Sequence, residues 1–112
     1  MRMERVDAGP ARVEDHEIAR WMAGRAEAVA AFLKAVSHEG RLMILCHLAG
    51  GEKSVTELEA LLGQRQAAVS QQLARLRLEG LVSTRREGKA IFYALHDPRV
   101  PALLRALPDN FT

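Results

Sequence analysis

The sequence predicts a mainly α-helical domain that carries one small β-hairpin towards its C-terminal end, in the order α-α-α-α-β-β-α. Apolar residues recur every three or four positions through most of the chain, as they do in amphipathic helices. Glycines separate these periodic segments, and two β-prone runs flank a Gly-containing turn within residues 81–95. Aromatic residues make up only 4% of the chain, so the core must be built mainly from small aliphatic side chains, which suits helices.

The N-terminal third of the chain predicts a flexible arm followed by a long helix. Residues 1–14 are of mixed charge, contain Gly9-Pro10 and show no period, so we assign the folded domain to residues 15–112. Asp15 can cap a helix that runs to about Val36. Its apolar stripe is Ile18, Met22, Ala26, Val29, Leu33 and Val36. Much of this stripe would stay exposed to solvent in a monomer, which indicates a dimer contact.

Two shorter helices should follow. Leu42, Ile44, Leu45 and Leu48 resume the helical period, and Gly50-Gly51 ends it. The run Ser54-Val55-Thr56-Glu57 is a capping box, in which the hydroxyl and the carboxylate each satisfy an orphan backbone N–H. It opens a short helix that ends at Gly63 and whose expected inward residues are Val55, Leu58, Leu61 and Leu62.

The next helix, Gln66–Glu79, has an unusual outer face. Val69, Leu73 and Leu76 share one side, and the other side carries Ala67, Ser70, Gln71, Ala74 and Arg75. No carboxylate occurs on it before Glu79, so it can approach a polyanion and hydrogen-bond base edges. The alternative is an ordinary solvated face, although such faces usually mix Glu with Lys. Leu78 also lies near this face and fits neither interpretation.

Two short helices joined by a tight Gly turn form a helix-turn-helix, and the β-prone runs that follow resemble its wing. Residues 81–86 and 89–95 flank Glu87-Gly88, which predicts a hairpin. Arg85, Arg86 and Lys89 cluster at its tip, where they would meet phosphate or the minor groove. The alternative role for these charges is solubility alone. A last short helix should begin at Asp97 or Pro98 and end before Pro108, with Val100, Leu103, Leu104 and Leu107 on its apolar side.

Charge is distributed unevenly along the chain. Residues 1–63 carry eight Lys/Arg against ten Asp/Glu, residues 64–93 carry six against two, and residues 94–112 balance. A basic block confined to the predicted helix and hairpin favours an anionic partner. No apolar run is long enough to span a bilayer, and no signal-peptide core is present. The single cysteine, Cys46, fits a reducing cytoplasm.

Over roughly residues 16–107 the chain resembles the ArsR/SmtB family of winged-helix repressors. Three runs carry the resemblance: residues 32–45 as the family's entry segment, residues 54–76 as its helix-turn-helix, and residues 80–95 as its wing. The resemblance implies a homodimer held by the first and last helices, operators with dyad symmetry, and release of the DNA by an inducer.

The family's inducer sites include metal sites and thiol sites. Its metal sensors carry thiols before the recognition helix or histidines on the last helix, and both stretches lack them here; His16, His38, His47 and His96 are scattered. We therefore expect neither a metal nor a cofactor. The run Leu45-Cys46-His47-Leu48 resembles the branch that senses sulfide, persulfides or oxidants. That branch pairs this cysteine with a second one, which would fall at or near Thr112.

Cys46 therefore has two interpretations, a sensor thiol or a small buried core residue. One thiol can form a sulfenate or a mixed disulfide, but no bridge within a single chain.

The sequence thus predicts a dimeric, cytoplasmic, non-enzymatic repressor of double-stranded operator DNA, possessing no membrane segment. The residues expected to contact DNA are Gln66, Ala67, Ser70, Gln71, Arg75, Arg85, Arg86 and Lys89; those expected at the dimer contact are Ile18, Met22, Val29, Leu103, Leu104 and Leu107. Two rival classes are a winged-helix protein-interaction module and an enzyme. The interaction module would have more exposed apolar groups on its recognition face. An enzyme would need a third partner beside Cys46 and His47.

Overall fold

The computed structural model describes residues 14–112, and the predicted N-terminal arm lies almost wholly outside this range. The chain divides into two compact units, one ending at Lys34 and the other beginning at Ala35. Within the described residues there are six α-helices, one short 3-10 helix and a three-stranded antiparallel sheet, which confirms the predicted fold class.

The first unit holds α1 and all but the last two residues of α2, where the sequence predicted one helix. The helix α1 spans Glu14–Met22 and α2 spans Ala26–Val36. Gly24 separates them with a φ of +83°, a backbone conformation that residues with a Cβ rarely adopt. Arg25 donates a side-chain hydrogen bond to the Trp21 carbonyl and lies over the indole ring, 5.0 Å from its centroid. The prediction of a continuous helix was wrong. The three-residue turn preserves the spacing of the apolar stripe, so the periodicity did not reveal the break.

The second unit contains a helical core and the sheet. The helix α3 spans Glu39–Leu48, α4 spans Val55–Leu62 and α5 spans Gln66–Leu78. After the sheet come α6 (Arg99–Ala106) and the 3-10 helix η1 (Pro108–Asn110). The buried side chains of this unit come from the end of α2, from α3 to α6, and from Leu81 and Val82 at the entry to the sheet: Ala35, Val36, Ile44, Leu45, Leu48, Leu58, Val69, Leu73, Leu76, Leu81, Val82 and Val100.

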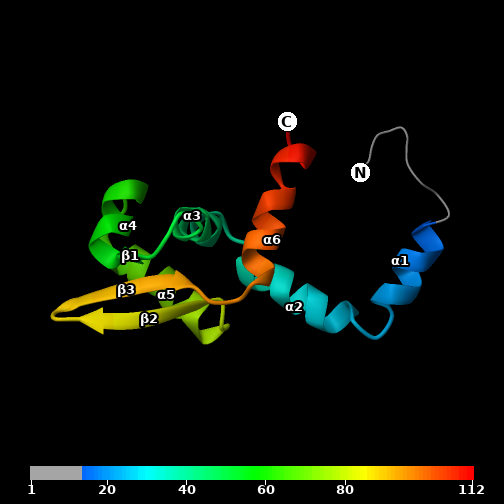
Figure 1. The fold of residues 1–112 in the computed structure, drawn as a ribbon, viewed down its shortest axis with the longest axis horizontal. Coiled ribbons are helices and arrows are strands. Elements are labelled where there is room, and N and C mark those ends of the chain that lie inside the picture. Colours follow the sequence, from blue (N-terminus) through cyan, green and yellow to red (C-terminus); the bar gives the residue numbers. More distant parts are fainter. Residues whose placement is uncertain (1–13) are drawn as a thin grey trace. The chain divides into compact units, whose positions relative to one another are not determined.

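The sheet contains one strand that the sequence analysis missed. The strand β1 is only Lys53–Ser54, β2 is Val82–Glu87 and β3 is Ala90–Leu95, in the order β1-β3-β2. Two residues are too few to show an alternating pattern, and the partner of β1 lies about forty residues away in β3. The β2–β3 hairpin extends away from the helices of this unit, with its turn at the far end (Figure 1). Gly88 occupies that turn with a φ of +62°.

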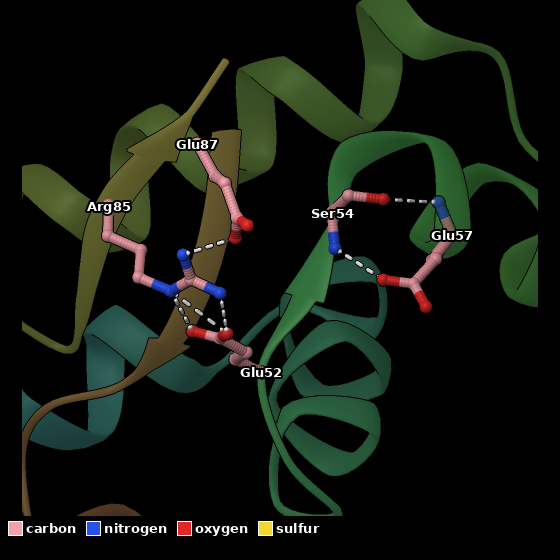
Figure 2. A network of polar contacts seen from close by, with 5 residues as sticks. All are labelled: Glu52, Ser54, Glu57, Arg85 and Glu87. Carbon is pink, nitrogen blue, oxygen red and sulfur yellow. Dashed lines mark hydrogen bonds and ion pairs between the residues drawn. The ribbon is translucent and has the colours of Figure 1, made fainter. Parts of the chain in front are cut away.

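Local signals around the helix-turn-helix were predicted well, with one exception. Ser54 and Glu57 form the expected capping box, in which the Glu57 backbone N–H donates to Ser54 Oγ at 3.1 Å and the Ser54 N–H to Glu57 Oε1 at 2.8 Å (Figure 2). Gly63 ends α4 in the left-handed conformation. Leu61, however, was expected inside and is 50% exposed, because α4 turns only the Leu58 side of its surface fully into the core.

Candidate nucleic-acid interface

Helix α5 presents the predicted outer face because its opposite side is fully buried. Val69, Leu73 and Leu76 each have no measurable exposure, and they fix the rotation of the helix about its own axis. The outward residues Gln66, Ala67, Gln71, Ala74 and Arg75 are exposed, and Ser70, on the flank, is partly covered.

The first turn of α5 carries no acidic side chain, and Arg65, its N-cap residue, makes no side-chain hydrogen bond to the helix. The first backbone N–H groups of a helix are not paired within it and carry partial positive charge. Together with the amides of Gln66 and Gln71, this end of α5 offers hydrogen-bond donors and acceptors to a ligand. The prediction did not include Arg65, which is exposed beside these groups.

The two arginines near the end of α5 differ in their partners. Arg75 donates from Nε to Glu79 at 3.1 Å, an i, i+4 ion pair on the helix surface. Among the residues that the structure describes, none pairs with the exposed Arg77. Arg77 therefore offers a guanidinium that no carboxylate of residues 14–112 neutralises, although the sequence analysis gave it no role.

The hairpin separates its two neighbouring arginines onto opposite faces. Successive residues of a strand point to alternate sides, so Arg86 shares a face with the buried Val82, whereas Arg85 lies on the other face with Glu87. Arg85 is directly opposite Phe92 in the register, and its guanidinium lies 4.6 Å from the centroid of that ring.

Arg85 is held by two carboxylates, as Figure 2 shows. Its Nε donates to both carboxylate oxygens of Glu52 at 3.0 Å, and its Nη1 donates to Glu87 at 2.8 Å. The hydrogen bonds from Arg85 lower the pKa of Glu52 below its ordinary value, and the two carboxylates raise the pKa of Arg85 above its own. The three side chains together carry one net negative charge.

This network changes how the tip of the wing is understood. The sequence suggested three equivalent cations, but Arg85 is already paired with two carboxylates of its own chain. Glu52 lies 33 residues before Arg85, next to the strand that was missed, so no local pattern could have indicated the pair. Within residues 14–112, Arg86 and Lys89 form no ion pair, and both are exposed.

A shallow depression lies between the end of α5 and the sheet. Its volume is about 390 Å³, and Ala74, Arg77, Leu78 and Tyr93 line it. Leu78 is 84% exposed, the most of the large apolar side chains in the described chain.

Cys46 lies on the exposed side of α3. Its neighbour Leu45 is fully buried, so the thiol points away from the core that Leu45 occupies. The interpretation of Cys46 as a buried core residue was therefore wrong.

No three His, Cys, Asp or Glu side chains within residues 14–112 gather closely enough to hold a metal ion. Every helix in that range is too short or too polar to traverse a lipid bilayer. The predicted dimer residues are uneven in exposure: Ile18 is exposed, and Met22, Val29, Leu103, Leu104 and Leu107 are half-buried.

A helix-turn-helix followed by a hairpin, with exposed amides and with cations that have no carboxylate partner in the described part of the chain, defines a winged helix-turn-helix regulator. Comparison with known proteins agrees. Residues 38–84 match the model of the family described as bacterial regulatory protein, arsR family. The chain belongs to the ArsR family and is a transcriptional regulator rather than an enzyme.

Its relatives include proteins named as repressors and a protein named as an activator. The chain is 52% identical over 86 residues to the biofilm growth-associated repressor of Agrobacterium fabrum, an alignment covering 77% of this chain and 74% of that protein. It is 48% identical over 75 residues to the transcriptional activator HlyU of Vibrio cholerae, covering 67% and 69%. Among solved structures it is similar to the transcriptional repressor BigR from Xylella fastidiosa, with a TM-score of 0.80 and 46% identity over 84% of this chain and 96% of that one.

Proposed function

We propose that this protein is a homodimeric repressor that binds double-stranded operator DNA and releases it when an inducer acts. The observation that supports this most directly is a set of exposed groups on one unit: the amides of Gln66 and Gln71, and the cations of Arg86 and Lys89, which form no ion pair within the described residues. Amide side chains can pair with adenine in the major groove, and unpaired cations can neutralise phosphates. Helix α5 would enter the groove while the Arg86 face of the hairpin meets the backbone.

A dimer would double this surface. In helix-turn-helix dimers, two recognition helices enter successive major grooves about 34–36 Å apart. Exposed Ile18 and Leu33 in the first unit give it apolar surface to bury against a second copy. We assign the contact to Ile18, Met22, Val29, Leu103, Leu104 and Leu107. One thiol, fully reduced, is compatible with a cytoplasmic protein.

We further propose that Cys46 is the sensing group. Its exposure allows an oxidant to reach the sulfur. With peroxide, the thiolate would attack one oxygen, the O–O bond would break, hydroxide would leave, and the sulfur would be oxidised to a sulfenic acid. With a polysulfide, attack on a terminal sulfur would expel a shorter polysulfide and leave a persulfide. One solved relative is described as reduced HlyU from Vibrio cholerae, so a redox state is distinguished for that protein.

The test is a DNA-binding titration with the reduced protein, repeated after polysulfide, peroxide and metal salts. The Cys46→Ser variant runs in parallel. We expect reduced protein to bind with an affinity that falls steeply with salt, and peroxide or polysulfide to weaken binding only when Cys46 is present. Equal release of the Cys46→Ser variant would remove the thiol from the mechanism.

A second candidate function is a protein-interaction module, which the high exposure of Leu78 on the recognition helix favours. Such a module would show no salt-dependent affinity for duplex DNA. The same titration therefore separates the two functions.

A further inference from the structure

The depression at the end of α5 has a chemical character unlike that of the outer face before it. Ala74 and Leu78 supply apolar surface from the helix, and Tyr93 supplies an aromatic side chain from β3. Arg77 adds a guanidinium with no partner among the described residues. An apolar floor beside one available positive charge fits a ligand that is part hydrocarbon and part anion.

The position of the depression along the helix narrows the choice of ligand. Leu78 is the last residue of α5, twelve positions after Gln66. At a rise of about 1.5 Å per residue, it lies roughly 18 Å from the helix start. The major groove is only about 12 Å wide. If the first turns of α5 reach the bases and its axis crosses the groove, Leu78 emerges at the edge of the groove, where the sugar–phosphate backbone runs.

We propose that this depression binds one sugar–phosphate unit of the DNA backbone. Arg77 would pair with the phosphate, while Leu78 and Tyr93 pack against the deoxyribose. The proposal rests on the proposed function, and it gives the exposed leucine a place in DNA binding. It also implies that the contact is independent of base sequence, because every nucleotide offers the same sugar and phosphate.

The test compares Arg77→Ala and Leu78→Ala with wild type on two duplexes, one of random sequence and one selected by the wild-type protein from a random library. We expect Arg77→Ala to weaken both equally and to lower the salt slope by about one unit. Leu78→Ala should weaken both by roughly threefold and leave the salt slope unchanged, because it removes apolar area and no charge. Both residues are exposed, and thermal melts confirm that the variants fold.

Matched controls exist within the same unit. Arg105→Ala removes an exposed cation from α6, and Leu61→Ala removes an exposed leucine from α4. Neither residue lines the depression. If either control costs as much as its test variant, the loss does not depend on the depression and the assignment fails.

Two modified forms of the selected duplex identify the contacted group. Neutral methylphosphonate at one position in each half-site should weaken wild type and leave Arg77→Ala unaffected. Replacing every thymine with deoxyuridine should affect wild type and Leu78→Ala alike. A loss confined to wild type on the deoxyuridine duplex would mean that Leu78 contacts a thymine methyl, which overturns the backbone assignment. Wild type that binds no duplex would instead refute the proposed function itself.

Discussion

The two faces of the β2–β3 hairpin carry adjacent arginines in opposite surroundings. On one face, Arg85 lies over Phe92 and donates to Glu52 and Glu87. On the other, Arg86 is exposed and has no partner among residues 14–112. Helix α5 repeats the contrast, since Arg75 pairs with Glu79 whereas Arg77 does not pair in the described chain. Pairing within the chain, more than position along it, determines which cation is available to an external phosphate.

The largest loss of DNA affinity should come from a substitution outside the hairpin, at Gln71. It would distinguish a residue that contacts bases from residues that contact phosphates. Gln71→Ala removes an exposed amide from the outer face of α5, so it should cost about 1–3 kcal/mol on the selected duplex. On random DNA the loss should be small. A titration of both duplexes measures this, and a uniform loss would show that Gln71 contacts the backbone.

The comparison of the two arginines is tested directly by Arg86→Ala against Arg85→Ala. Arg86→Ala should weaken binding to selected and random DNA by roughly 1 kcal/mol each and lower the salt slope by about one unit, because one phosphate contact is lost. Arg85→Ala should change the slope much less. Equal slopes for the two variants would break the distinction between the faces.

Glu52→Gln tests the same difference between Arg85 and Arg86 from the other side, because it removes one of the two carboxylates that pair with Arg85. Without the Glu52 charge, only Glu87 competes with DNA phosphate for the guanidinium. We expect a modest gain in affinity for random DNA and a salt slope steeper by less than about one unit. The double variant Glu52→Gln/Arg85→Ala is the control, in which that gain should disappear.

The smallest effect concerns pH. The pKa of Glu52 is lowered in the folded protein by hydrogen bonds from Arg85, so the pair stabilises the fold above the unfolded pKa of this carboxyl. That contribution is lost as pH falls through the lower, folded pKa. Because the pair is exposed, the difference in Tm between wild type and Glu52→Gln should be small at neutral pH and vanish in acid. Thermal melts across this range measure it, and a difference that grows in acid would contradict the assignment.

Sequence periodicity and local motifs predicted the features of the fold that depend on contacts between residues close together in the chain. The buried stripe of α5, the capping box at Ser54 and the turn at Gly63 follow from residues within one or two helical turns of each other. The pairing of Glu52 with Arg85 depends on a two-residue strand that joins distant segments, so no pattern indicates it. The break at Gly24 had a signal, a glycine inside a periodic stretch, but the stripe continued across it. Cys46 was ambiguous because α3 is apolar on more than its buried side.

The stacked pair at the end of α1 gives the protein a natural optical reporter. Trp21 is the only tryptophan in the chain, it is half-exposed, and the Arg25 guanidinium covers one face of its ring. None of the elements proposed to meet DNA contains another indole. Tryptophan emission, excited where Tyr93 absorbs little, therefore monitors the N-terminal unit alone. On dilution of an unlabelled sample it would follow dissociation of the proposed dimer, while a labelled duplex reports separately on DNA binding.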